Sequence, residues 1–227
     1  GKEPFIIGHT STQMIPANYT FLDAQLNGEQ FTGGLVDNDY IRSLDVPMLL
    51  TQWRAPLMGI PAIFLPEIMW QALKRNRWSS KDLFEKHLVS DEAVTATRNL
   101  MALLLPNDII FYGGLQNIPL AERIWGVWDT LGEAQYVSHR SATVSTRPGP
   151  KTVHAGLYLR PDGTALLAVG NLEETTADVA ITIDPKTLDL SDMTVADKFE
   201  GKPCTLATQT VTLAVGGRDF RLVELKK

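Results

Sequence analysis

Apolar residues in the first part of the chain occur in short continuous runs, each followed by polar residues. The runs cover residues 5–7, 19–22 and 60–65. Short apolar runs bounded by Gly and Pro are typical of buried parallel strands, which lack strict alternation. Polar side chains just past the carboxyl ends of such strands are where an α/β protein carries its chemistry. We therefore expect the functional residues in this region.

The pattern becomes helical between residues 67 and 131. Ser90, Asp91 and Glu92 indicate a helix start because the helix dipole favours acidic residues there. This helix should stop before Pro106, and residues 109–112 read as a further strand. A second amphipathic helix is predicted over residues 119–131, with Gly132 as its stop.

After Gly132 the apolar period changes to two residues. Alternating runs separated by turn residues indicate an antiparallel sandwich, and Arg160-Pro161-Asp162-Gly163 predicts a hairpin turn. We expect no helix longer than two turns between Val153 and Leu225. The predicted strands cover residues 153–159, 165–169, 177–184, 193–197, 210–215 and 220–225.

Composition excludes several function classes. The net charge of -5 and the lack of a dense Lys/Arg tract disfavour binding to nucleic acid or to an anionic membrane. The four histidines are scattered without metal-ligand spacing, and no Gly-rich phosphate loop occurs. We therefore expect no metal and no cofactor. The one cysteine, Cys204, excludes an intrachain disulfide and does not fix the compartment.

A helical half followed by this strand-rich tail resembles the end of a bacterial (β/α)8-barrel glycoside hydrolase with its C-terminal β-sandwich. The hairpin at residues 160–163 and the following Gly170-Asn171 are similar to the sandwich of α-amylase-like and α-galactosidase-like enzymes. The resemblance implies an α/β plus all-β fold, with a partial TIM-type barrel over residues 1–135 and an antiparallel sandwich over 136–227. Because three or four strands cannot close an eight-stranded barrel, the first half of the barrel would be absent.

Glycoside hydrolysis uses two carboxyl groups that flank the bond. Asp23 and Glu29 are the catalytic candidates, since they follow the run at 19–22; the alternative is a loop cap and a solvated acid. Glu67 follows the third run and either binds substrate or serves as a first-turn helix acid. His9 follows the first run and either contacts a sugar hydroxyl or is an ordinary loop histidine.

A sugar subsite is the second expectation. Asp39 and Tyr40 together with Trp53 and Arg54 could line it, because an aromatic face stacks on a sugar ring and Arg reaches a hydroxyl or carboxylate. The alternative places Trp53 in the core and Arg54 in a structural ion pair. Asp37 to Tyr40 also predicts a capped helix start.

These observations predict a carbohydrate-processing hydrolase, and the alternative is a non-catalytic carbohydrate-binding or structural module. The substrate would be a carbohydrate of unspecified sugar and linkage, and a hydrolase of this type favours a secreted or periplasmic location. We expect the chain alone to be inactive, because its candidate strands leave an open edge. An upstream barrel segment, a partner chain or a second copy would cover that edge.

Overall fold

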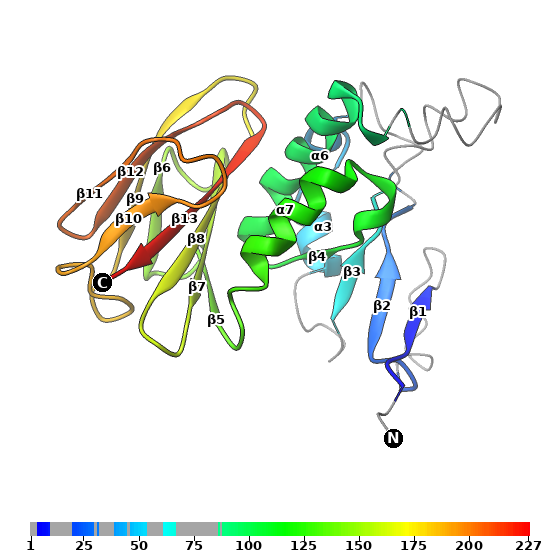
Figure 1. Cartoon of the computed structure of the whole chain (residues 1–227), viewed down its shortest axis with the longest axis horizontal. Helices are drawn as coiled ribbons and strands as arrows, with labels where there is room; N and C mark the ends of the chain where they lie inside the picture. Colours follow the sequence, from blue (N-terminus) through cyan, green and yellow to red (C-terminus); the bar gives the residue numbers. More distant parts are fainter. Residues whose placement is uncertain are drawn as a thin grey trace. The chain divides into compact units, whose positions relative to one another are not determined.

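The computed structural model describes residues 4–9, 20–29, 31, 39–44, 46–53, 61–66, 86 and 88–227, with only the backbone of residues 48, 51 and 52 (Figure 1). The chain forms two compact units. The first comprises Gly1–Thr97 and Asp108–Ala121, and the second comprises Arg98–Asn107 and Glu122–Lys227. The division differs from the single boundary expected after residue 135, because two helical segments belong to the same unit as the C-terminal strands.

The first unit is built on a parallel sheet. Its strands are β1 (Ile7–His9), β2 (Ala24–Asn27), β3 (Ala62–Phe64) and β4 (Ile110–Phe111), and they lie in the order β1-β2-β3-β4. Every neighbouring pair is parallel. Strands adjacent in the chain are therefore also adjacent in the sheet, as in repeated strand-crossover-strand units.

The predicted second strand at residues 19–22 is wrong. Thr20 and Phe21 form a turn, and the strand begins at Ala24. Phe21 is 76% exposed, whereas Ala24 is 1% exposed. Pairing with strands on both sides selects the weakly apolar segment Ala24–Asn27 and leaves the preceding apolar run outside the sheet. The predicted strands at 60–65 and 109–112 are confirmed over the residues that the structure describes there.

The strand register separates two faces of the parallel sheet. His9 pairs with Leu26, Leu26 with Ile63, and Ile63 with Ile110. Paired residues point to the same side of a sheet, so these four define one face, here called the His9 face. Their neighbours in sequence define the opposite face, called the Phe64 face, which includes Asn27, Phe64 and Phe111.

The Phe64 face is covered by aromatic packing. Helix α2 (Tyr40–Ser43) supplies Tyr40, and helix α3 (Val46–Trp53) supplies Trp53. Their rings lie 5.9 and 5.4 Å from the Phe64 ring. The His9 face is more open: Ile7 and Ile110 are 50% and 51% exposed. Side chains that point to the carboxyl end of this face are therefore accessible.

Two longer helices follow the predicted pattern. Helix α6 (Asp91–Leu104) begins after Ser90, whose Oγ accepts a hydrogen bond from Ala93 N at 3.2 Å. The 3-10 turn η2 (Leu105–Asn107) contains Pro106 and ends the helical segment. A second 3-10 turn, η3 (Gly113–Leu115), follows β4. Helix α7 (Ile118–Trp128) starts where Asn117 Oδ1 accepts from Leu120 N at 3.0 Å.

The second unit is a β-sandwich. Its five-stranded sheet has the order β10-β13-β8-β7-β5, and its four-stranded sheet has the order β11-β12-β9-β6. All pairs are antiparallel, and residues 153–225, which the structure describes throughout, contain no helix, so that prediction is confirmed. The strands are β5 (Gln135–Ser138), β6 (Val144–Arg147), β7 (Val153–Leu159), β8 (Ala165–Asn171), β9 (Ala177–Ile183), β10 (Thr194–Asp197), β11 (Cys204–Ala207), β12 (Thr210–Val215) and β13 (Asp219–Lys226).

The central strands β7 and β8 of the five-stranded sheet are buried on both faces. One face packs against the other sheet in a single apolar core, which contains Leu167, Ile181 and Val223. The other face lies against the second half of α6 and the turn η2. Gly170 of β8 is required there, because a Cβ at this position would lie 1.7 Å from the carbonyl oxygen of Ala102.

No helix among the described residues is long and apolar enough to cross a membrane.

Candidate active site at the carboxyl edge of the parallel sheet

The sheet brings His9 and Glu29 together. His9 is the last residue of β1, and Glu29 follows β2 by two residues. His9 Nε2 lies 3.5 Å from Glu29 Oε2, and the two side chains are 39% and 28% exposed. Because β1 and β2 are parallel neighbours, their carboxyl ends deliver an imidazole and a carboxylate to one accessible place. Such a pair can transfer a proton and can hydrogen-bond a hydroxyl group.

A tight turn aims Glu29 at this edge. Gly28 has φ +138, a backbone conformation that side chains disfavour, and a Cβ there would lie 2.9 Å from both the N and the O of Leu65. Asn27 Oδ1 accepts from Gly28 N at 2.9 Å, and Asn27 O accepts from Leu65 N at 2.8 Å. The sequence signal Asn27-Gly28 thus marks the turn that places the carboxylate.

Asp23 lies at the opposite end of β2. It precedes the strand, and its Oδ2 accepts a hydrogen bond from Ile6 N at 2.7 Å. The expectation that Asp23 follows a strand end is therefore wrong. The four strand residues of β2 separate Asp23 from Glu29 by roughly 13 Å, so the two carboxyl groups are too far apart to flank one bond. A glycosidase needs its two carboxyl groups about 5–9.5 Å apart. Asp23 fixes the start of β2 beside the chain that leads into β1.

The predicted sugar subsite is not formed by its aromatic residues. Tyr40 is 0% exposed and Trp53 is 3% exposed, so neither ring offers a face to a ligand. Asp39 caps α2 through its side chain, which accepts from Arg42 N at 3.0 Å, and this confirms the predicted helix start. Arg54 and Glu67, the remaining members of the predicted site, lie outside the described residues.

Sequence reasoning gave no functional role to Tyr112, which directly follows β4. The residue is 47% exposed at the carboxyl edge of the sheet. The run at residues 109–112 followed by two glycines was the available signal, since it places an aromatic residue at a strand end beside a turn. The alternation of Ile110, Phe111 and Tyr112 puts Phe111 in the core and leaves the other two exposed.

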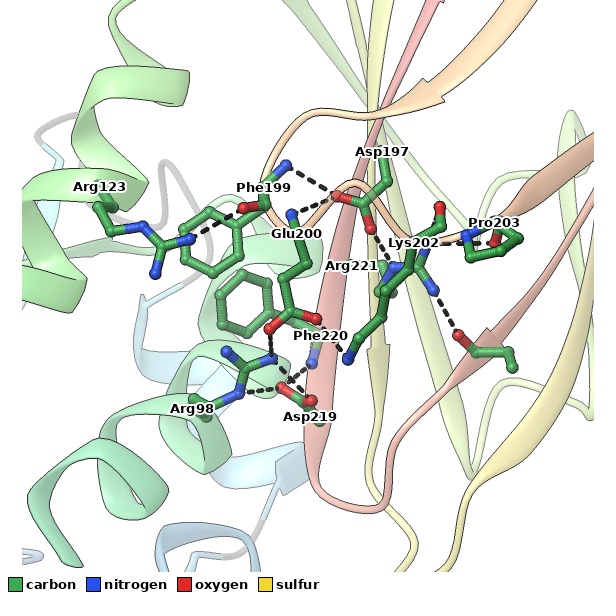
Figure 2. A network of polar contacts seen from close by, with 11 residues as sticks. Arg98, Arg123, Asp197, Phe199, Glu200, Lys202, Pro203, Asp219, Phe220 and Arg221 are labelled. Carbon is green, nitrogen blue, oxygen red and sulfur yellow. Dashed lines mark hydrogen bonds and ion pairs between the residues drawn. The ribbon is translucent and has the colours of Figure 1, made fainter. Parts of the chain in front are cut away.

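The second unit contains a polar network of a different kind (Figure 2). Arg98 of α6 bonds Asp219 and Glu200, while Asp197 and Arg221 form an ion pair that is 0% and 2% exposed. Burial lowers the pKa of Arg98, but the hydrogen bond to Asp219 raises it, and the net effect is an increase in the pKa. Because these charged groups pair with one another, we infer that the network stabilises the sandwich.

Other reactive groups do not form a site in the described residues. The described part of the chain contains no group of three His, Cys, Asp or Glu side chains that could hold a metal ion. Cys204 is half-buried, and burial raises the pKa of its thiol, which is the opposite of an activated nucleophile.

Comparison with known proteins gives a match at the level of fold. No family model and no curated protein sequence matches the chain. Among solved structures, a noncanonic maltogenic alpha-amylase AmyB from Thermotoga neapolitana has a TM-score of 0.55 at 12% identity. The match covers 100% of this chain and 55% of the amylase chain. An alpha-amylase from Geobacillus thermoleovorans complexed with acarbose has a TM-score of 0.56 at 8% identity, covering 98% and 53%. AmyP in complex with maltose has a TM-score of 0.53 at 10% identity, covering 97% and 55%.

The chain spans about half the length of these structures. At such low identity the likeness shows a glycoside hydrolase-like fold and transfers no catalytic residue. The whole length of the chain takes part in the match, including both the parallel sheet and the sandwich.

Proposed function

We propose that this chain is the C-terminal part of a glycoside hydrolase, in which a (β/α)8 barrel cleaves a glycosidic bond and a β-sandwich follows the barrel. The observation that carries the proposal is the order of the parallel strands, β1-β2-β3-β4, followed after helix α7 by an antiparallel two-sheet unit. In a (β/α)8 barrel each strand pairs with the next one in the chain, and the chemistry occupies the carboxyl ends. The fold likeness to alpha-amylases over the whole chain supports it.

Within this proposal, Glu29 is one of the two carboxyl groups and His9 binds it. Glu29 is accessible, follows a parallel strand and faces His9 at 3.5 Å. The second carboxyl group must come from another strand end, because Asp23 is too distant. Glu67 is the candidate, since it follows β3 by three residues in the sequence and β3 is the neighbour of β2.

The alternative function, a non-catalytic carbohydrate-binding module, receives less support from the sandwich. Sugar-binding surfaces commonly offer an exposed aromatic ring. In residues 130–227, which are all described, no large aromatic side chain is exposed. An accessible histidine-carboxylate pair at the strand ends favours the enzyme.

The decisive experiment compares Glu29→Gln with Asp23→Asn in the full-length protein, assayed on soluble starch and on a panel of aryl α- and β-glycosides. We expect E29Q to lower kcat by at least about 100-fold, the order of effect for removing a general acid or base. D23N keeps an oxygen that accepts from Ile6 N and should retain turnover. Wild-type turnover in E29Q, or no hydrolysis by the unmodified protein, would refute the proposal.

A further inference from the structure

Tyr112 lies at the same edge of the sheet as the His9–Glu29 pair. It directly follows β4, and its N–H donates to Phe64 O at 2.8 Å, which continues the ladder between β3 and β4. With successive strands about 4.8 Å apart, Tyr112 is roughly 10 Å across the sheet from the end of β2. That separation leaves room for a ligand that contacts both places.

Tyr112 also belongs to the His9 face. Ile110 is in register with His9 through Leu26 and Ile63. Residues two apart in a strand point to the same side, so Tyr112 follows Ile110 onto this face, one step nearer the carboxyl end. The register therefore gives the phenol ring and the imidazole a common side as well as a common edge.

A glycine holds the ring in place. A Cβ at Gly114 would lie 2.7 Å from Tyr112 Cε1 and 2.9 Å from its Oη, so the ring rests directly over this residue. The Tyr112 carbonyl accepts from Gln116 Nε2 at 3.3 Å. The ring is thus supported from below while 47% of the residue stays exposed. Phe31, the other described aromatic residue near this edge, instead stacks on Phe64 at 6.3 Å.

We propose that Tyr112 is an aromatic platform on which a sugar ring of the substrate stacks beside the His9–Glu29 pair. A pyranose offers an apolar C–H face that suits an aromatic ring, so the contact rests on the ring and not on the phenol hydroxyl. This inference rests on the proposed hydrolase function and adds a binding residue that acts on affinity rather than on proton transfer.

The test measures binding without turnover, in full-length protein carrying E29Q. Maltotriose, cellotriose and xylotriose are titrated calorimetrically into this protein and into forms that also carry Tyr112→Leu, Tyr112→Phe or Phe21→Leu. Y112L keeps the apolar volume and removes the aromatic face. F21L makes the same kind of change at an exposed aromatic residue at the amino end of β2, 76% exposed, and is the matched control.

We expect Y112L to raise the Kd of the bound trisaccharide by about tenfold. The melting temperature should stay unchanged. Y112F and F21L should bind as the parent does. Equal affinity of Y112L and its parent, or equal weakening by F21L, would overturn the inference, as would the absence of binding by any of the three sugars. If E29Q loses turnover while Y112L keeps the parental affinity, the hydrolase function is supported and only the role of Tyr112 in sugar binding is rejected.

Discussion

Arg98 and Asp219, 121 positions apart in the sequence, form a two-bond fork. Arg98 Nε donates to Asp219 Oδ1 and Nη2 donates to Oδ2, both at 2.8 Å (Figure 2). The side chains are 19% and 16% exposed. This planar, bidentate geometry is specific to arginine, and it ties α6 to the start of β13.

Replacing Arg98 with Met should destabilise the sandwich unit. The apolar stem remains, but Asp219 loses both arginine donors and keeps only the bond from Phe220 N. Hydrogen bonds to charged groups are worth about 1.5–3 kcal/mol. We expect a loss of about 2 kcal/mol in the free energy of unfolding by urea. Glu174→Ala is the control, because Glu174 also binds an arginine, Arg218, but its side chain is 75% exposed. Equal effects of the two changes would contradict the assignment.

Gly170 provides a second stability prediction. Because a Cβ here would lie 1.7 Å from the backbone oxygen of buried Ala102, Gly170→Ala must displace either β8 or α6. We expect a loss of about 3 kcal/mol or more, at the upper end of overpacking effects. Gly126→Ala is the opposite case: Gly126 lies inside α7 with nothing within 4 Å, so alanine should stabilise by about 0.5–1 kcal/mol. Thermal unfolding of both variants measures the contrast.

The sandwich could be predicted well because its signals are local. Alternating apolar residues and turn residues define β7, β8 and β9, and the turn at 160–163 forms with Gly163 at φ 81. Four residues carry few alternations, so the short strands β5, β6 and β11 were missed, although β10, of the same length, was predicted. Helices α6 and α7 were predicted from their capping residues and period.

The candidate site could be predicted only in part. His9 and Glu29 follow strand ends that the apolar runs mark approximately. The role of Asp23 depended on which residues between 19 and 27 form the strand, and pairing with β1 and β3 decides that. Aromatic residues such as Tyr40 and Trp53 occur both in protein cores and in sugar subsites. Only their burial in the structure distinguishes these two roles.

The acidic turns of the sandwich should not contribute to catalysis. Asp162 Oδ1 accepts from Thr164 N at 2.9 Å and from Thr164 Oγ1 at 2.7 Å, and these bonds lower the pKa of Asp162. Asp184 Oδ1 accepts from Lys186 N at 2.8 Å. Asparagine supports the same turns, so Asp162→Asn and Asp184→Asn should leave turnover of the full-length protein nearly unchanged. A hundredfold loss of turnover in either variant would show that the sandwich supplies a catalytic group.

His154 should make the sandwich unit sensitive to acid. Its Nδ1 lies 2.8 Å from Asn107 Nδ2, and its ring centroid is 4.6 Å from that of His139. Burial, followed by the charges of His139 and Arg140, lowers the pKa of His154 to about 3. The ring therefore stays neutral in the folded protein at pH values where an unfolded histidine, with a pKa near 6.5, is already protonated.

Between pH 6.5 and 3 the unfolded state thus binds one more proton at this residue, and the stability falls as the pH falls. The slope approaches about 1.4 kcal/mol per pH unit, so lowering the pH from 7.5 to 5.0 should cost about 2 kcal/mol at His154 alone. His154→Asn keeps an acceptor for Asn107 and removes the titrating group. The difference in unfolding free energy between the two proteins, measured in urea from pH 7.5 to 5.0, should therefore shift in favour of the variant as the pH falls. A difference that stays constant over this range would show that His154 takes up its proton equally in both states.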